Sequence, residues 1–231
     1  MTKYLLLAGL VTGPAGLSAA SVNELTAREK SDGWKLLFDG KTTAGWHKFK
    51  TAPFPGKGWA VEDGWLHGLA KGGGDIISDD QFDQFELSWE WKIAAGGNSG
   101  LKYFVADTRS SALGHEYQMI DDAKNEDAKA PQGKHVTASF YDVLAPTSKL
   151  PLKAAGEINE SRILVKGSHV EHWLNGVKVL EYDCGSDGTK AAVAGSKFKT
   201  TPDFGTCVKG HILLQDHSSQ VWFRNIKIRS L

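Results

Sequence analysis

Residues 114–122 read GHEYQMIDD, and we expect the rest of the chain to be arranged around this stretch. As a β-strand, it places Glu116 and Gln118 on one face and Tyr117 and Met119 on the other, because successive side chains alternate. The second face is suited to a packed core. The first carries a carboxylate and a carboxamide about 7 Å apart, which is two strand steps. The stretch therefore predicts a strand whose outer face is a polar floor.

Three more polar side chains lie in stretches that we also expect to be strands or strand ends. Glu90 precedes the central stretch, and Gln215 and His217 follow it. Where several strands of one sheet place polar residues on the same face, the usual result is a cleft for a polar ligand. We therefore expect Glu90, Glu116, Gln215 and His217 to share one cleft.

The composition is that of an ordinary soluble globular protein. The chain has 231 residues, of which 41% are hydrophobic and 23% charged, and this is enough to bury one large core. Its 27 basic and 27 acidic residues give a formal net charge of zero, so the charge balance does not support a nucleic-acid or acidic membrane partner. Eight Trp, ten Phe and five Tyr are plentiful. Such rings suit sugar binding, although core packing explains most of them.

Residues 1–20 have the pattern of a signal peptide. Lys3 is a short basic start, residues 4–11 are apolar, and residues 18–20 form a small-residue cleavage site. The apolar run is too short to span a membrane. We expect export to the periplasm or the extracellular space, with residues 21–231 forming a single β-sandwich domain.

Cys184 and Cys207 are the only two cysteines. In an oxidising compartment this pair predicts a disulfide. On the chain-entropy model, the bridge would stabilise the segment between them by roughly 3 kcal/mol. Two free buried thiols are the alternative. Two cysteines alone do not make a structural zinc site.

Short alternating stretches separated by turn signals follow one another along the chain. Residues 85–93 are the clearest, because Leu87, Trp89 and Trp91 alternate with polar neighbours. Residues 59–69 predict a hairpin with its turn at Asp63-Gly64. Further strands are expected at residues 34–38, 101–105, 161–166, 169–174, 177–182, 212–216 and 221–228.

Helical patterns are rare. A short helical turn is expected within residues 24–30 and a short helix within residues 186–200. Many short strands with frequent turns predict an all-β jelly-roll sandwich of two antiparallel sheets. One sheet of such a fold is curved, and its concave face is where we expect a ligand to bind.

Five blocks of the sequence resemble the family of 3-keto-disaccharide hydrolases, formerly the domain of unknown function 1080. In the family's order, from Gly33 to Arg229, the blocks are WKLLFDGKTTAGW, GNSGLKYFV, GHEYQMIDD, GEINESRILVKGSHVEHWLNGVKV and GHILLQDHSSQVWFRNIKIR. The resemblance implies a concanavalin A-like jelly roll, an exported bacterial protein, and action on glycosides oxidised at carbon 3.

The implied substrate sets the chemistry that the site must perform. A ketone at carbon 3 makes the proton on carbon 2 acidic, because the resulting carbanion is an enolate. A base removes that proton, and hydrogen-bond donors or a cation stabilise the enolate. The group at carbon 1 then leaves and water adds. An ordinary glycosidase would instead need two carboxylates at a set separation.

Three residues are the candidates for catalysis. Glu116 is a candidate general base or metal ligand, and the alternative is a carboxylate in a salt bridge at the strand edge. Glu90 has a similar position, and its alternative is a solvated outer face. His217 ends a strand beside a turn, where an imidazole acts as acid or base near neutral pH; bonding to the local backbone is its alternative.

Five residues are candidates for substrate binding. Gln118 and Gln215 could hold sugar hydroxyls or satisfy the neighbouring backbone. Lys102 is a cation near the expected cleft, or a solvated surface lysine. Trp173 offers a stacking platform but fits the core equally well. Arg224 could bind the ketone oxygen, although we favour pairing with a carboxylate across the sheet.

No cofactor is certain from the sequence, and a divalent metal ion is left open. The chain lacks the second His of a zinc-protease helix and the spacing of a calcium loop. Any metal would need ligands from separate strands, for example Glu116, Asp121 and His217. Two functions from different classes remain: an enzyme that cleaves 3-keto-glycosides, and a non-catalytic, lectin-like carbohydrate-binding domain, because a fold does not fix function.

Overall fold

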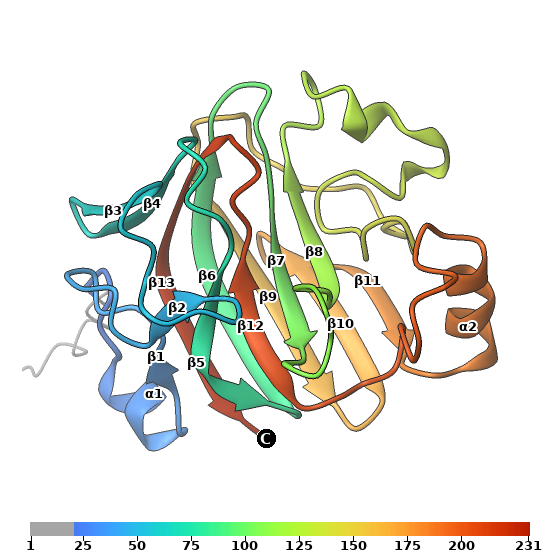
Figure 1. Ribbon diagram of the computed structural model, residues 1–231, viewed down its shortest axis with the longest axis horizontal. Helices are drawn as coiled ribbons and strands as arrows, with labels where there is room; N and C mark the ends of the chain where they lie inside the picture. The colour runs from blue at the N-terminus through green and yellow to red at the C-terminus, as the bar shows by residue number, and fades with distance from the viewer. Residues whose placement is uncertain (1–20) are drawn as a thin grey trace, which may run out of the picture.

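Two antiparallel β-sheets pack face to face in the computed structural model, which describes residues 21–231 (Figure 1). The signal peptide expected over residues 1–20 lies outside the described residues. The predicted all-β sandwich of two antiparallel sheets is confirmed. Among residues 21–231, none of the helices has the length and apolar character needed to span a membrane.

The larger sheet has eight strands. In spatial order they are β11 (Val177–Asp183), β10 (His169–Leu174), β9 (Asn159–Lys166), β6 (Phe85–Ile93), β13 (Gln220–Ser230), β4 (Trp65–Leu69) and β3 (Trp59–Glu62), with β1 (Lys35–Leu36) paired to β13. The predicted strand at residues 85–93 and the three-stranded meander that ends in β11 are present. Tight turns join the strands of this meander, as the Asn175-Gly176 pair indicates.

The smaller sheet has five strands and lies in front of the larger one in Figure 1. In spatial order they are β2 (Trp46–Lys48), β5 (Ile76–Phe82), β12 (Gly210–Leu214), β7 (Asn98–Val105) and β8 (His115–Ile120). Strands β2 and β5 were not expected from the sequence. Strand β5 buries its ends and exposes three consecutive polar residues, so it has no period of two to recognise.

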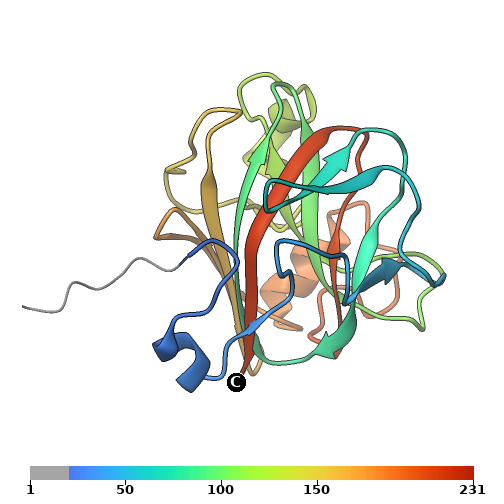
Figure 2. The same cartoon turned by 90° about the vertical axis from the view of Figure 1, so that its left-hand side faces the viewer.

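Four short helical segments accompany the sheets: α1 (Ala27–Ser31), α2 (Asp187–Ala194) and the 3₁₀ turns η1 (Asp127–Lys129) and η2 (Pro131–Gly133). Both expected helical regions are therefore present. The N-cap of α1 is Thr26, which forms a reciprocal capping box with Glu29. Helix α1 and the C-terminus lie toward the same end of the molecule (Figure 2).

The core lies between the inner faces of the two sheets. Trp89 and Trp91 from β6 and Tyr117 from β8 are fully buried there, and each large apolar side chain contributes about 1.5–3 kcal/mol on burial. Ser161 Oγ on β9 lies 2.8 Å from Trp91 Nε1 and 2.8 Å from the Tyr117 hydroxyl. Burial of these polar atoms is therefore compensated, and Tyr117 is held so that its neighbours on β8 face outward.

The disulfide expected between Cys184 and Cys207 is present, with 5.5 Å between the Cα atoms. It joins the end of β11 to the approach of β12 and so closes the segment that contains α2. This segment also contains Lys197 and Phe198, which line the pocket described next. The disulfide therefore restrains part of the wall of that pocket.

Candidate active site

The outer face of the smaller sheet holds a polar pocket of about 130 Å³, here called the Glu116 pocket. Glu116 and Gln118 reach it from β8, and Lys102 reaches it from β7. Lys102 is the register partner of Glu116, so the two side chains lie on the same face with Cβ atoms about 4.5–5.5 Å apart. Gln215 and His217, which follow β12, complete the floor. The polar floor expected on β8 is therefore present and extends over two more strands.

The walls of the pocket come from three connecting segments. Leu113 precedes β8, Tyr141 lies in the connection between β8 and β9, and Lys197 and Phe198 follow α2. The Lys197 ammonium lies 4.1 Å from the centre of the Tyr141 ring, which is a cation–π contact. The pocket thus has a cation on its floor and another on its wall.

Glu116 is the buried acid of this pocket. Its exposed fraction is only 6%, and no hydrogen bond to its carboxylate is present among residues 21–231. Burial raises the pKa of Glu116, while the positive charges of Lys102 and Lys197 oppose the rise. A carboxylate with a raised pKa is a better base toward a carbon acid near neutral pH.

A glycine makes room for this carboxylate. A Cβ placed on Gly100 of β7 would lie 2.4 Å from Glu116 Oε1, which is far inside van der Waals contact. The Glu116 carboxylate therefore rests directly on the backbone of the neighbouring strand, where a larger residue would displace it.

Lys102 lies between two acids. It is only 9% exposed, and its Nζ is 4.0 Å from Asp75 Oδ2 on one side while Glu116 faces it on the other. Burial raises the pKa of Asp75, and Lys102 opposes the rise. Asp75 also accepts a 2.9 Å hydrogen bond from the backbone N–H of Asp216. Asp75 therefore helps to hold the turn that carries His217.

The two amides of the floor differ in how they are satisfied. The Gln118 side-chain oxygen accepts a 3.2 Å hydrogen bond from the backbone N–H of Met119, so local backbone contact accounts for part of its role. The Gln215 side-chain oxygen is buried and has no hydrogen-bond partner among the described residues. Such an orphaned acceptor in a pocket is what a ligand hydroxyl would satisfy.

A hydrogen-bonded network supports the wall. His135 bridges two carboxylates, with 2.7 Å from Nδ1 to Asp127 Oδ1 and 2.9 Å from Nε2 to Asp142 Oδ1. Although burial opposes it, the hydrogen bonds to Asp142 and Asp127 raise the pKa of His135. Tyr141 donates to Asp127 Oδ2 at 2.9 Å, and Asp142 accepts from the backbone N–H of Lys197 at 2.6 Å. The network thus fixes the positions of both Tyr141 and Lys197.

The expectation that Glu90 shares this cleft is wrong. Glu90 lies on β6 of the larger sheet, where its carboxylate accepts from Arg224 Nε at 2.7 Å and Asn225 Nδ2 at 2.8 Å. The outer face of that sheet is on the opposite side of the sandwich. The alternation of residues 85–93 identifies the outer face of a strand but not the sheet that contains it. The favoured interpretation of Arg224, pairing with a carboxylate across the sheet, agrees with this geometry.

Trp173 also lies away from the Glu116 pocket. It belongs to β10 of the larger sheet, its ring is covered by the Arg162 guanidinium at 4.0 Å, and its Nε1 donates to Glu171 at 2.7 Å. These contacts occupy both the face and the polar edge of the ring. Trp173 is therefore neither a platform in this pocket nor a residue of the central core.

The ligand set considered for a metal ion is not brought together. Asp121 accepts from the backbone N–H groups of Gly96 and Ala123 and lines a different cavity. Within residues 21–231, Glu116, Asp121 and His217 do not form a group with donor atoms close enough to hold an ion. These three residues therefore do not fit a metal site that they would form together.

One group of suitable donor atoms does occur, on β10 and β11: His169, Glu171 and Glu181. The Lys178 ammonium already contacts both of its carboxylates, so this group is neutralised by a side chain.

Most of the chain matches a known protein family. Residues 33–229 match the model of the 3-keto-alpha-glucoside-1,2-lyase-like domain. A 3-keto-disaccharide hydrolase of Bacteroides thetaiotaomicron is 33% identical over 246 residues, which cover 93% of this chain and 84% of the relative.

Solved structures of similar chains agree with the fold. A Parabacteroides distasonis protein assigned by name to the glycosyl hydrolases is 36% identical with a TM-score of 0.81, and the match covers 91% of this chain and 100% of the other. A second protein so assigned from the same organism is 30% identical with a TM-score of 0.68, covering 86% of this chain and 99% of the other.

Proposed function

Because the chain belongs to the family of 3-keto-alpha-glucoside-1,2-lyase-like domains, we propose that it cleaves the glycosidic bond of 3-keto-glycosides, with Glu116 as the general base. The observation that carries this proposal is the state of Glu116. It is a buried carboxylate with a raised pKa and no hydrogen bond among the described residues, and it faces the ammonium group of Lys102. A carboxylate with a purely structural role would be paired.

In the proposed reaction, Glu116 takes the proton from carbon 2. The electron pair of that C–H bond forms the double bond between carbons 2 and 3, and the negative charge moves to the oxygen on carbon 3. The ketone on carbon 3 then re-forms, and the electron pair of the double bond between carbons 2 and 3 moves to make a double bond between carbons 1 and 2. At the same time the bond from carbon 1 to the glycosidic oxygen breaks, its electron pair leaves with that oxygen, and the oxygen takes up a proton. Addition of water to the double bond between carbons 1 and 2 yields 3-ketoglucose when the keto sugar is glucose.

The other floor residues have roles that follow from their chemistry. Lys102 supplies positive charge for the enolate oxygen from a buried position, where a preorganised charge is most effective. The free acceptor of Gln215 and the amide of Gln118 bind sugar hydroxyls. His217, exposed on the turn after β12, is a second candidate acid or base of the pocket.

We further propose that the enzyme acts after export, in the periplasm or outside the cell. Support comes from the signal-peptide pattern of residues 1–20 and from the Cys184–Cys207 disulfide, because disulfides persist in oxidising compartments.

The direct test is to incubate the purified protein with 3-keto-trehalose or a 3-keto-glucoside and to quantify released 3-ketoglucose. The wild type and Glu90→Gln should release it, whereas Glu116→Gln and His217→Ala should be impaired. If the wild type releases no ketosugar but binds saccharides measurably, the protein is a carbohydrate-binding module and the proposed reaction is wrong.

A further inference from the structure

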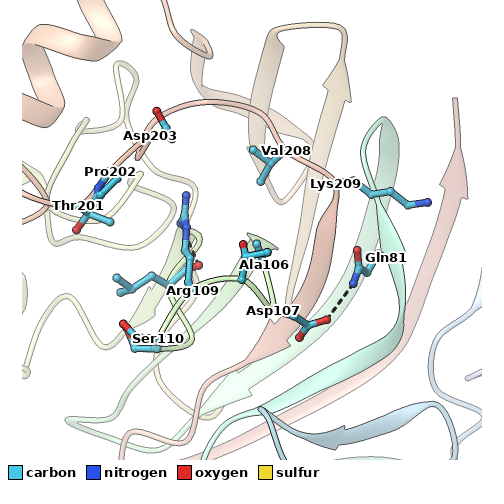
Figure 3. Close-up of a pocket in the computed structure, with 13 residues that line it drawn as sticks. Gln81, Ala106, Asp107, Arg109, Ser110, Thr201, Pro202, Asp203, Val208 and Lys209 are labelled. Atoms are coloured by element: carbon cyan, nitrogen blue, oxygen red, sulfur yellow. Dashed lines mark hydrogen bonds between the residues drawn. The ribbon is translucent and has the colours of Figure 1, made fainter.

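A second, larger cavity adjoins the Glu116 pocket. It has a volume of about 710 Å³ and lies between the β7–β8 connection and the segment that leads from α2 to β12 (Figure 3). Leu113 lines both this cavity and the Glu116 pocket. The two spaces are therefore neighbours along one side of the smaller sheet.

The two segments that enclose the larger cavity also contribute residues to the Glu116 pocket. The segment after α2 contributes Lys197 and Phe198 to the Glu116 pocket and Thr201 and Asp203 to the larger cavity. A hydrogen bond of 2.8 Å from the Thr201 N–H to the Phe198 carbonyl joins these parts in one turn. A ligand that extends out of the Glu116 pocket past Leu113 would thus enter the larger cavity.

Size indicates that the two spaces serve one ligand. Ligand pockets in proteins usually measure about 300–1,000 Å³. The Glu116 pocket, at about 130 Å³, is below this range, whereas the neighbouring cavity, at about 710 Å³, lies inside it. The Glu116 pocket can hold the reacting end of a substrate, but the remainder of a disaccharide needs further space.

Arg109 is the group in the larger cavity with donors to spare. Its Nη1 donates to the Leu113 carbonyl at 3.2 Å, and no ion pair with a carboxylate is present among residues 21–231. Burial lowers the pKa of Arg109, and the negative charge of Asp203 opposes this. A guanidinium carries five N–H donors, so several are available to a ligand. In Figure 3 the Arg109 side chain extends from the β7–β8 connection toward Asp203, which lies on the segment between α2 and β12.

The remaining lining favours hydroxyl groups over aromatic rings. Asp203, Ser110 and Thr201 offer acceptors and donors, and no aromatic side chain is among the lining residues. Asp107, by contrast, is already occupied, because it accepts from Gln81 Nε2 at 3.1 Å and lies 3.0 Å from His211 Nε2. The free polar groups therefore gather around Arg109.

We propose that this cavity is the subsite for the leaving group, and that it takes a polyhydroxylated one such as a second sugar, held by Arg109 and Asp203. The inference rests on the proposed function, since it assigns the leaving-group side of the same reaction. Arg109 binds the substrate at a distance from the reacting carbons, and its contribution disappears when the substrate has no sugar to place there.

The first experiment compares two substrates. The kcat/KM for 3-ketoglucose release is measured with 3-keto-trehalose and with methyl 3-keto-α-glucoside, for the wild type, Arg109→Ala, and Lys166→Ala as an exposed control on the larger sheet. Loss of hydrogen bonds to a charged group predicts that Arg109→Ala lowers kcat/KM for the disaccharide by roughly 10- to 100-fold and leaves the methyl glycoside unaffected. Equal losses on both substrates, or no loss on the disaccharide, would overturn the subsite.

A second experiment does not depend on turnover. Free glucose and phenol are titrated by NMR into the wild type and into Arg109→Ala, whose melting temperature is measured to confirm folding. Glucose should bind in the wild type and weaken at least tenfold in the variant. Unchanged glucose binding, or tighter binding of phenol than of glucose, would contradict the proposal. If the wild type cleaves neither glycoside, the proposed reaction fails, and this titration still decides whether the cavity binds a sugar.

Discussion

Each outer face of the sandwich carries glutamate at outward positions of a strand, but the two faces use it differently. On the larger sheet, Glu86 accepts from Arg162 Nη1 at 2.6 Å and from Arg229 Nε at 2.8 Å, and Glu90 is bound by Arg224. On the smaller sheet, Glu116 is more deeply buried than Glu90 yet has no hydrogen bond among residues 21–231. The first face carries paired charges, and the second carries the candidate active site.

Under the proposed function, pairing rather than the presence of an acid separates a structural carboxylate from a reactive one. Arginines bind carboxylates with two parallel donors and keep them ionised and fixed. An unpaired buried carboxylate costs folding free energy, and proteins retain such groups where function needs them. The predictions below test this contrast, from the largest expected effect to the smallest.

Replacing the unpaired acid should have the largest effect. We expect Glu116→Gln to lower the rate of 3-ketoglucose release by about 10²–10⁴-fold, the range contributed by general base catalysis. The matched change on the other face, Glu90→Gln, should leave the rate within about twofold, because Glu90 pairs with Arg224. Steady-state assays of both variants check this. Equal losses of rate in the two variants would show that Glu116 matters no more to the reaction than Glu90 does.

Gly100→Ala should impair the reaction without removing a catalytic group. The added Cβ would lie 2.4 Å from Glu116 Oε1, so the carboxylate must shift, and small displacements of a catalytic group cost up to about 100-fold in rate. Activity assays and thermal unfolding separate the two possible consequences. A variant that keeps wild-type activity would show that the contact with Gly100 does not position Glu116.

On the larger sheet, the expected loss is one of stability. Glu86 is buried, and Glu86→Gln leaves the partly exposed donors of Arg162 and Arg229 imperfectly paired, so we expect a loss of about 1–3 kcal/mol in the free energy of unfolding. The rate of 3-ketoglucose release should be unchanged. Glu126→Gln is the control, because its pair with Lys129 is exposed and should contribute little. Urea denaturation measures both variants, and a stability change confined to Glu126→Gln would contradict the assignment.

The smallest effect concerns pH. Because the pKa of folded Glu116 is raised by burial, the folded state binds its proton more tightly than the unfolded state does. The stability from this group is present below the ordinary glutamate pKa and is lost as pH rises through the raised value. Glu116→Gln should therefore be more stable than the wild type near neutral pH, with the advantage disappearing in acid. Melting temperatures of both proteins across pH test this. A stability advantage of Glu116→Gln that grows as the pH falls would contradict the prediction.

Much of the fold could be predicted because it depends on local patterns. The alternation of residues 85–93 and 114–122 identifies two core-facing strands, and the turn pairs of residues 161–182 identify the meander. The face that Glu116 and Gln118 share on β8 follows from the same period of two. These features depend on residues close together in the chain, so they can be recognised from the sequence alone.

The rest of the site depends on contacts between distant segments. Whether Glu90 or Lys102 stands beside Glu116 is decided by which sheet contains each strand, and alternation does not encode this. Tyr141 and Lys197 reach the pocket from irregular connections, where no periodic pattern marks a side chain as facing a ligand. The free acceptor of Gln215 is likewise visible only once its neighbours are in place.

The measurement that tests the central claim most directly is cleavage of a 3-keto-disaccharide carrying deuterium at carbon 2, followed under single-turnover conditions beside the ordinary substrate. Removal of that proton by Glu116 predicts a several-fold slower reaction of the deuterated substrate with the wild type, and almost no reaction of either substrate with Glu116→Gln. Equal rates for the two substrates, together with full activity of Glu116→Gln, would contradict the account.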